Sequence, residues 1–389
     1  MKIKKILITI SIVLGAAYFV ATQTIPGMIE TAKNSTKEFP PYNVSKKADS
    51  LYKSLEFIAD LHCDALLWSR DLTKKSEVGH VDFPRMQEAN IAFETFTIVT
   101  KSPVNQRFSN TSSEGPDNIT RLSIAQGRPI QTWFSLFKRA TYQAKKLHRY
   151  EKRYDNQFEI IKSAEDLSVF LERRKTDTKL ISGLLGIEGA HCLEGDLENL
   201  DRLYDAGIRL VGPTHFFDNE LGGSAHGLSG EGLTEFGKQV IDRMNELGMI
   251  IDLTHTSSKM IDDILEHTNS PVIVSHTGVF GTYESPRNLT DKQLQMIAKN
   301  GGLVGITFFK GAIPEVGVEG IVDAVKYVAD FIGIEHVAIG SDYDGSIKAP
   351  FDITGFPLIV EEMLKQGFNE NEIKAVMGEN VKNFLLANL

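Results

Sequence analysis

The amino-acid sequence predicts an α/β fold, a (β/α)8 TIM-type barrel with an extended βα loop that carries a helical insertion. From Glu56 onward, short apolar segments rich in β-branched residues alternate with amphipathic segments of helical periodicity. Alternation of strand and helix implies parallel strands joined by right-handed crossovers, and eight such units in one chain favour a closed barrel. A doubly wound open sheet is the structural alternative.

Eight segments have the apolar character of strands, and helical patterns follow several of them. The predicted strands are residues 57–62, 91–99, 180–188, 208–214, 249–255, 272–276, 302–308 and 337–342. The helical patterns include residues 234–247, 257–266, 291–299 and 321–331.

The connection formed by residues 101–179 is too long for an ordinary βα loop. It contains a helical pattern over 132–153 that is rich in aromatic and basic residues. We expect an extended loop whose extra helices cover the barrel mouth. Its basic residues either attract acidic partners or, in the simpler interpretation, form a solvated helix face; they are Lys138, Arg139, Lys145, Lys146, Arg149, Lys152 and Arg153.

The N-terminal residues are typical of a targeting segment. Three lysines within residues 2–5 precede an apolar run over 6–21, and no cysteine follows for lipidation. Residues 1–25 are therefore predicted to be a signal or signal-anchor, and the poor cleavage signal favours an uncleaved anchor. The polar residues 26–50 are predicted to be a linker to a domain over 51–389. On either interpretation the domain is extracytoplasmic, and it is membrane-anchored, secreted or periplasmic.

The composition narrows the class of protein. Hydrophobic residues make up 42% and charged residues 24%, as in a soluble globular domain. The net charge of −9 argues against nucleic acid as the main partner. The two cysteines, Cys63 and Cys192, cannot form a disulfide framework, and two buried thiols are favoured over a single bridge.

Polar residues stand at the ends of the first and third predicted strands. The first strand ends in His62, Cys63 and Asp64. Because strand side chains alternate faces, His62 and Asp64 point the same way and Cys63 the other. Such a pair either chelates one metal ion or forms a hydrogen bond without metal. Glu188 ends the third strand, and burying its carboxylate requires a positive partner, either a metal ion or an arginine.

Two histidines, His255 and His276, end consecutive predicted strands. Their independent coincidence with His62, Asp64 and Glu188 at one barrel face is improbable, so these five residues are predicted to be metal ligands. Histidine nitrogen and carboxylate oxygen suit zinc, with other divalent metals as alternatives. Five ligands that include one bridging carboxylate imply two zinc ions per chain and an activated water between them.

Further polar residues surround this set. His215 ends the fourth strand and is either a ligand or a donor to a developing oxyanion. Arg287 follows the sixth strand and either holds a substrate carboxylate or lies in a surface loop. Asp342 ends the eighth strand and is placed for proton transfer at the metal-bound water. Asp344 precedes Gly345 and is expected to form a turn.

Taken in order, these motifs resemble those of the membrane dipeptidase family of zinc metallopeptidases, within the amidohydrolase-type barrels. The resemblance extends over about residues 56–389. It rests on residues 60–64, 186–189, 214–215, 251–255, 271–276, 287–288 and 340–345. It implies that His62 and Asp64 bind one zinc ion, that His255 and His276 bind a second, and that Glu188 bridges both.

The resemblance also implies an activity. His215 would contact the tetrahedral oxyanion, Arg287 would bind the substrate carboxylate, and Asp342 would pass a proton to the leaving amine. The reaction would be hydrolysis of dipeptides with a free C-terminal carboxylate, on an L or D residue, by a metal-bridging hydroxide. The family is often dimeric, so a homodimer is an expectation. Two departures, in the first part of 101–179 and at Phe309, where some relatives have a tyrosine, concern substrate choice.

Two other functions are alternatives to a dipeptidase. Another binuclear-metal hydrolase, such as a deacylase, lactonase or phosphoesterase, would use the same metal core, but Arg287 favours a substrate with a carboxylate. A catalytically silent binding protein would require loss of ligands or of Asp342, and the sequence retains them.

Overall fold

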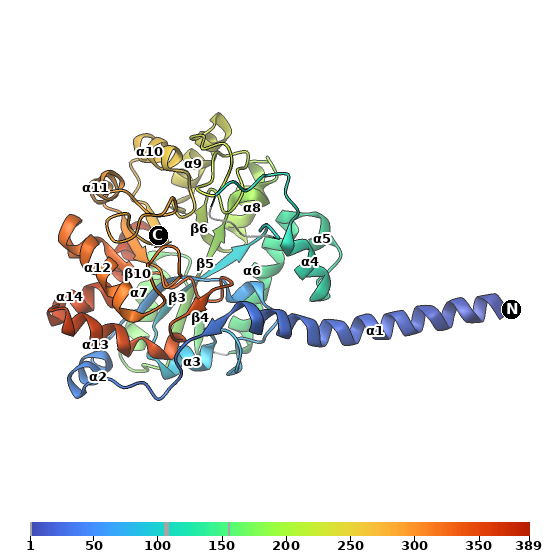
Figure 1. Ribbon diagram of the computed structural model, residues 1–389, viewed down its shortest axis with the longest axis horizontal. Coiled ribbons are helices and arrows are strands. Elements are labelled where there is room, and N and C mark those ends of the chain that lie inside the picture. Colours follow the sequence, from blue (N-terminus) through green and yellow to red (C-terminus); the bar gives the residue numbers. More distant parts are fainter. Residues whose placement is uncertain (1, 105–108, 155) are drawn as a thin grey trace.

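The computed structural model describes residues 2–104, 109–154 and 156–389, and its body is a ring of parallel strands surrounded by helices (Figure 1). The strands of the ring are β2 (Ala59–Cys63), β3 (Phe93–Val99), β5 (Ile181–Glu188), β6 (Ile208–Gly212), β7 (Ile250–Ile251), β8 (Ile273–Thr277), β9 (Leu303–Ile306) and β10 (Val337–Ile339). They pair in chain order from β2 to β7 and from β8 to β10. Isolated parallel bridges, Asp252 with Ile273 and Cys63 with Tyr343, join the two sheets. The predicted (β/α)8 barrel is confirmed, and the open-sheet alternative is excluded.

Each predicted strand segment contains or overlaps one observed strand, but several observed strands are shorter. The largest difference is at β7, which covers only the start of the predicted segment 249–255. Beyond it, the Asp252 carboxylate accepts hydrogen bonds from the amide and hydroxyl of Thr254, and His255 has a φ of 63°. The chain therefore leaves the strand ladder at the point where the polar residues begin.

Helices surround the barrel and follow its strands. They are α2 (Lys46–Lys53), α3 (Phe83–Glu88), α7 (Ala164–Arg174), α8 (Glu198–Asp205), α9 (Glu235–Leu247), α10 (Ser258–His267), α11 (Asp291–Asn300), α12 (Val318–Ile332), α13 (Pro357–Lys365), α14 (Glu370–Lys374) and α15 (Asn380–Asn388). The four helical patterns named from the sequence correspond to α9, α10, α11 and α12. Thr234, Ser257 and Thr290 begin the first three, since each hydroxyl accepts a hydrogen bond from an amide in the first turn.

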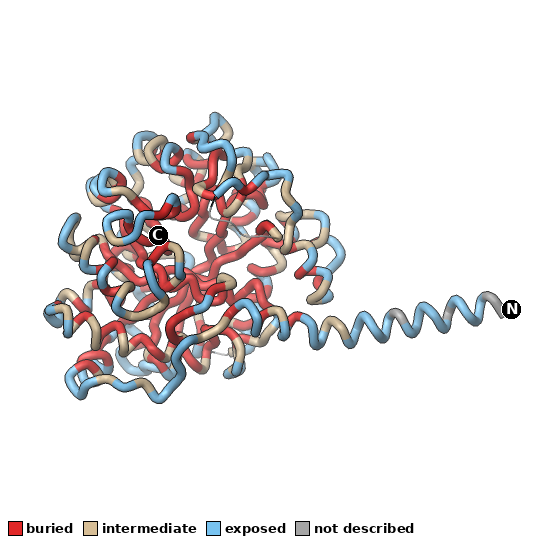
Figure 2. Tube along the Cα trace, viewed as in Figure 1, coloured by how far each residue is buried: buried red, intermediate tan, exposed pale blue. Residues whose placement is uncertain are grey.

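Apolar side chains fill the interior of the barrel below the C-terminal ends of its strands. Leu184, Leu210, Ile250 and Ile273, one from each of four strands, are buried in one cluster. A larger apolar cluster occupies the layer between strands and helices. Figure 2 shows this arrangement as buried strands inside a shell of partly exposed helices. Both layers hold the strand ends in place.

The long connection between β3 and β5 contains the helices α4 (Asn118–Ala125), α5 (Gln131–Phe134) and α6 (Leu136–Arg153), together with α7 and a short strand, β4 (Phe158–Ile160). β4 was not predicted and pairs in parallel with the first residues of β5. The basic helix α6 is not simply a solvated face. Arg139 is buried and forms an ion pair with Asp117 at 2.5 Å, and Lys146 is buried and donates to the carbonyl of Leu66 at 3.2 Å.

The N-terminal helix α1 (Lys2–Lys33) projects from the body, and its outer part is exposed (Figures 1 and 2). Among the described residues, one helix, Lys4–Lys33, is long and apolar enough to cross a membrane. The helix continues through Pro26, so residues 26–33 are helical, although the sequence assigned them to a linker. The next residues form β1 (Ser35–Thr36), which pairs in parallel with β11 (Lys348–Ala349). The first part of the predicted linker is therefore helical, and the residues that follow it pair with β11 of the barrel domain.

Candidate metal centre

The polar residues predicted from the sequence meet at the C-terminal end of the barrel. Strands β2, β5 and β8 bring His62, Glu188 and His276 to this end, and the turn after β7 brings His255. All four are buried, with less than a tenth of each side chain exposed. In a parallel barrel this face carries functional side chains because the strand ends converge there.

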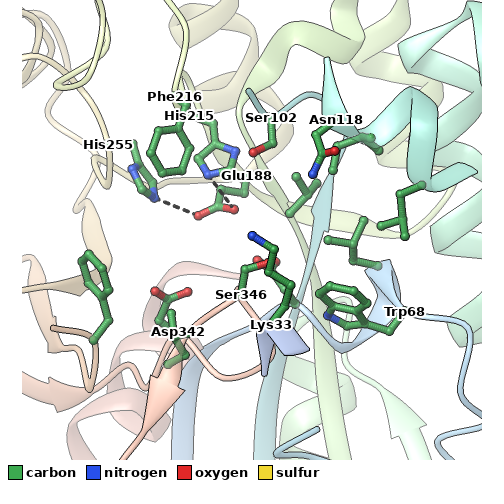
Figure 3. Close-up of a pocket in the computed structure, with 18 of the residues that line it drawn as sticks. Lys33, Trp68, Ser102, Asn118, Glu188, His215, Phe216, His255, Asp342 and Ser346 are labelled. Atoms are coloured by element: carbon green, nitrogen blue, oxygen red, sulfur yellow. Dashed lines mark hydrogen bonds and ion pairs between the residues drawn. The ribbon is translucent and has the colours of Figure 1, made fainter. Parts of the chain in front are cut away.

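Glu188 is the centre of the cluster. Its Oε1 lies 2.9 Å from His255 Nε2, 3.4 Å from His276 Nε2 and 3.5 Å from His62 Nε2. Its Oε2 lies 3.3 Å from His215 Nε2, and Figure 3 shows His215 and His255 approaching this carboxylate from one side. A buried carboxylate without a metal ion needs only one hydrogen-bonded histidine, whereas Glu188 has four imidazoles around it. The arrangement therefore favours a metal site over an isolated buried His–Glu pair.

Three overlapping sets of residues have ligand atoms within 4.8 Å of one another. They are His62 with Asp64 and Glu188, Glu188 with His215 and His255, and His62 with His276 and Asp342. Glu188 belongs to two of these sets, which is the placement expected of a bridging carboxylate. The donor set of imidazole nitrogens and carboxylate oxygens fits divalent metal ions such as zinc.

Ser275 and Asp252 orient two of these histidines and were missed from the sequence. The Ser275 hydroxyl donates to Asp252 Oδ2 at 2.6 Å, and its oxygen lies 3.1 Å from Nδ1 of both His62 and His276. A hydroxyl that donates to a carboxylate can accept from two N–H groups. This arrangement places the ring protons on Nδ1 and leaves both Nε2 atoms available to a metal ion.

Thr97 and His226 support the other side of the cluster and were also missed. The Thr97 hydroxyl lies 2.6 Å from Asp64 Oδ1, and His226 Nε2 lies 2.8 Å from His255 Nδ1. Thr97 is not distinguished by its sequence context, because Glu94 and Thr95 precede it in the same strand. No local pattern marks His226, which comes from the loop before α9.

Burial dominates the electrostatics of the protein groups. It raises the pKa of Glu188 well above its usual range, and the neighbouring Asp64 raises it further. Burial lowers the pKa of His255 and of His276 well below the usual range, and nearby positive groups, including Arg287, lower both pKa values further. His62 differs: burial lowers its pKa, but Glu188 and Asp64 raise it more, to about 9. Bound cations would relieve the repulsion among these buried carboxylates.

The backbone at the site adopts conformations that side chains rarely take. His255 and Asp342 have φ values of 63° and 64°, in the left-handed region. Gly189 follows Glu188 with a φ of 84°, and a Cβ there would lie 2.8 Å from the Cβ of His215. Glycine at this position thus allows His215 to approach Glu188. Unfavourable conformations of this kind persist where the surrounding structure holds functional residues in place.

Arg287 and Asp342 lie at the edge of the cluster. Arg287 is 6% exposed, so it is not a surface-loop arginine, and it donates from Nη2 to the carbonyl of His276 at 2.7 Å. Burial raises the pKa of Asp342 to about 8, against the opposing effect of His62. His215 has a buried Nδ1 without a hydrogen-bond partner among the described residues. All eight residues singled out from the sequence thus lie together.

A cavity of about 270 Å³ opens above the cluster. Asp64, Glu188, His215, His255, Arg287 and Asp342 line its floor, whereas His62 and His276 lie beneath. Phe309 lines the cavity, as does Phe216. The opposite wall comes from α1 and α4, which contribute residues that include Ile29, Lys33, Ile119, Arg121 and Leu122. The insertion after β3 therefore covers the barrel mouth as predicted.

Asp344 is more than a turn residue. Its buried carboxylate forms an ion pair with Arg70 and accepts a hydrogen bond from the His80 amide at 2.7 Å. Burial opposes its charge, but Arg70 and His80 hold the pKa of Asp344 well below its usual range. Cys63 and Cys192 are both free and buried, as expected from the sequence. Cys63 belongs to the larger apolar cluster, between the strands and the helices, and not to the cluster around Glu188.

A TIM-type barrel with a buried cluster of histidines and carboxylates at its C-terminal face defines the class of metal-dependent hydrolases. The family described as membrane dipeptidase (peptidase family M19) matches residues 45–385, and the chain belongs to this family. The protein is a hydrolase, a dipeptidase of the M19 metallopeptidases.

Individual relatives agree with this assignment. Dipeptidase verJ of Clonostachys rogersoniana is 34% identical over 358 residues, which cover 87% of this chain and 88% of the relative. Among solved structures, the M19 metallopeptidase dipeptidase AC is 27% identical, with a TM-score of 0.70, over 85% of this chain and 98% of the other. A metallopeptidase from Rhodobacter sphaeroides, solved with a phosphinate mimic of L-Ala-D-Ala, is 25% identical, with a TM-score of 0.68, over 85% and 99% of the two chains.

Proposed function

We propose that this protein is a zinc-dependent dipeptidase that hydrolyses dipeptides with a free C-terminal carboxylate, on an L or D residue. The observation that carries the proposal is the placement of the buried Arg287 guanidinium at the edge of a cavity whose floor is the Glu188 cluster. A carboxylate held by Arg287 would direct the adjoining peptide bond towards that cluster.

Two zinc ions per chain fit the ligand sets. His62 and Asp64 would hold one ion, His255 and His276, whose Nε2 atoms lie 3.1 Å apart, would hold the other, and Glu188 would be shared between them. The Nδ1 contacts of His62 and His276 to Ser275, and of His255 to His226, support this assignment because they fix which ring nitrogen faces the ions. Two bound ions would polarise the peptide carbonyl and lower the pKa of a water between them.

The residues of the chain itself would complete the reaction. Arg287 binds the substrate carboxylate and fixes the direction in which the dipeptide lies. His215 lies beside Glu188 and donates a hydrogen bond to the oxygen on which charge develops. Asp342 accepts a proton on the side of the attacking water and delivers it to the departing amine. A covalent intermediate with the enzyme is not required.

The N-terminal helix fits an extracytoplasmic location. We propose that α1 remains attached as an anchor, because it is long and apolar enough to cross a membrane and its C-terminal end is held against the barrel by the ion pair of Glu30 with Arg70. The anchor would hold the barrel at the outer side of a membrane, where small peptides from the surroundings reach the cavity.

The decisive experiment measures metal content and turnover together. We expect two zinc ions per chain and hydrolysis of a panel of L,L and L,D dipeptides. Arg287→Gln should lower kcat/KM for free dipeptides by about a hundredfold, as expected for a charged hydrogen-bonding partner, and affect C-terminal amides far less. Lys365→Gln on the surface of α13 is the control and should change neither. Equal losses of Arg287→Gln on both kinds of substrate would contradict the carboxylate-binding role.

Another hydrolase on the same metal core is the second candidate. A deacylase, lactonase or phosphoesterase would cleave substrates that lack a C-terminal carboxylate, and Arg287 would then be dispensable. This candidate would be favoured if substrates without a C-terminal carboxylate were hydrolysed faster than every dipeptide, and if Arg287→Gln hydrolysed them at the wild-type rate.

A further inference from the structure

The wall of the cavity contains residues that lie outside the part of the chain matched by the family. That match begins at residue 45, but Ile29 and Lys33 of α1 line the cavity together with Glu188 and Asp342. Figure 3 shows the Lys33 side chain directed into the space beside Glu188 and Ser346. We call residues 29–36 the docked segment.

Several contacts hold the docked segment against the barrel. Glu30 is buried and forms an ion pair with Arg70 at 2.6 Å, and Arg70 in turn pairs with Asp344. Asn34 accepts a hydrogen bond from the Ser346 amide at 2.9 Å. Because Asp344 and Ser346 follow Asp342 closely in the chain, the docked segment is fixed to the same loop that carries the acid/base residue.

Backbone pairing extends this attachment. The docked segment ends in β1, which pairs with β11. The ring of the buried His80 contacts both sides: its Nδ1 accepts from the Asp344 amide at 3.0 Å, and its Nε2 lies 3.2 Å from the Ser35 carbonyl. The docked segment is therefore a built part of the cavity wall.

The charges on this wall point to the kind of substrate. Among the described residues that line the cavity, those of α1 and α4 include two cations, Lys33 and Arg121, and no carboxylate. Within the same described part of the chain, Lys33 has no ion pair or side-chain hydrogen bond, whereas its neighbour Glu30 is paired. The acidic residues lie instead on the floor, where they would hold the metal ions.

We infer that Lys33 is a specificity-determining residue, which favours dipeptides that carry an acidic side chain in addition to the C-terminal carboxylate. The inference rests on the proposed function, because Arg287 binds the terminal carboxylate there. The side-chain carboxylate then lies at the wall, where Lys33 and Arg121 attract it. A substrate with two carboxylates would thus be held at the floor and at the wall.

The test uses the full-length protein in detergent, loaded with zinc, and substrate pairs that differ by one charge. Ala-Glu is compared with Ala-Gln, and Asp-Ala with Asn-Ala. The wild-type protein should prefer the acidic member of at least one pair. The preference is measured as kcat/KM for the acidic substrate divided by kcat/KM for its neutral partner. Lys33→Gln should lower this ratio by roughly fivefold, the effect of one partly screened ion pair, and Lys33→Glu should lower it further. Raising the ionic strength should weaken the preference of the wild-type protein more than that of Lys33→Gln, in which only Arg121 remains to attract the side-chain carboxylate.

Lys37→Gln provides the matched control. Lys37 lies four residues further along, does not line the cavity, and donates to the carbonyl of Val316 at 3.1 Å. The Lys37→Gln variant should have the same ratio of kcat/KM for acidic and neutral substrates as the wild-type protein. An unchanged ratio in Lys33→Gln, with both substrates still cleaved, would overturn the inference and leave the dipeptidase function intact. If the wild-type protein cleaves no dipeptide of the panel, the proposed function itself fails, and the inference fails with it.

Discussion

The floor and the wall of the cavity are built in different ways. The floor consists of side chains at or just beyond the ends of barrel strands, and four of the proposed ligands, His62, His276, Asp64 and His255, contact the buried partners Ser275, Thr97 and His226. The wall consists of α1 and α4, which reach the cavity from outside the ring. A shared rigid frame thus positions the proposed metal ligands, whereas individual ion pairs and hydrogen bonds position the wall.

This difference separates two tasks. Metal binding requires several ligands within a few tenths of an ångström of their positions, which strand ends inside a packed barrel provide. Substrate choice requires only that one surface present suitable groups, so a segment attached by a few contacts is sufficient. Changes to the floor should therefore alter metal content, and changes to the wall should alter the preference for substrates.

Replacement of Glu188 should have the largest effect. Glu188→Ala removes the carboxylate that contacts four imidazoles, so we expect loss of bound metal and a decrease in turnover of roughly a thousandfold or more. Metal analysis and steady-state kinetics measure both effects. Glu198→Ala, an exposed change on α8, is the control. Full activity with unaltered metal content in Glu188→Ala would contradict the two-metal proposal.

Replacement of Asp344 should destabilise the connection between floor and wall. Asp344→Asn leaves Arg70 buried with only Glu30 as its carboxylate partner, which should cost about 3 kcal/mol of folding free energy. The pKa of Asp344 is lowered in the folded protein, so its charge stabilises the fold above about pH 4 and this contribution is lost as the pH falls further.

Thermal unfolding between pH 7 and pH 3 tests this prediction. The wild-type protein should lose more stability than Asp344→Asn over that interval. Asp330→Asn, which removes an exposed partner of Lys326, should change stability by less than about 0.5 kcal/mol. Parallel pH curves for wild type and Asp344→Asn would show that the ion pair with Arg70 does not stabilise the fold.

Replacement of Ser275 should weaken the floor without removing a ligand. Ser275→Ala deprives the Nδ1 atoms of His62 and His276 of their shared acceptor, so metal affinity should fall by about 10- to 100-fold. Competition with a chelator measures this affinity. Ser168→Ala on the exposed side of α7 serves as the control. Unchanged affinity would mean that the histidines are held by packing alone.

The difference between floor and wall also explains what the sequence could predict. His62, Glu188 and His276 were identifiable because each ends an apolar strand, and strand ends of a parallel barrel must meet. The roles of Ser275 and His226 could not be predicted, since polar residues of these types occur throughout the chain.

The wall depends on contacts between residues far apart in the sequence, which no local pattern records. Glu30 meets Arg70 across 40 residues, and Tyr18 meets Ile124 across 106. The apolar composition of α1 predicted a helix for targeting. It could not indicate that the end of this helix would be held at the cavity by contacts such as the ion pair of the buried Glu30 with Arg70.

Replacement of Glu30 should have the smallest effect and separates the two regions most cleanly. Glu30→Gln keeps a side chain of the same size but removes one charge of the Arg70 network, while Arg70 retains Asp344. The docked segment should become less firmly held, so kcat/KM should decrease about threefold, whereas metal content and metal affinity stay unchanged. Glu38→Gln, an exposed change beyond β1, should have no effect. If Glu30→Gln instead lowers metal affinity in parallel with kcat/KM, the wall supports the floor and the two regions act as one unit.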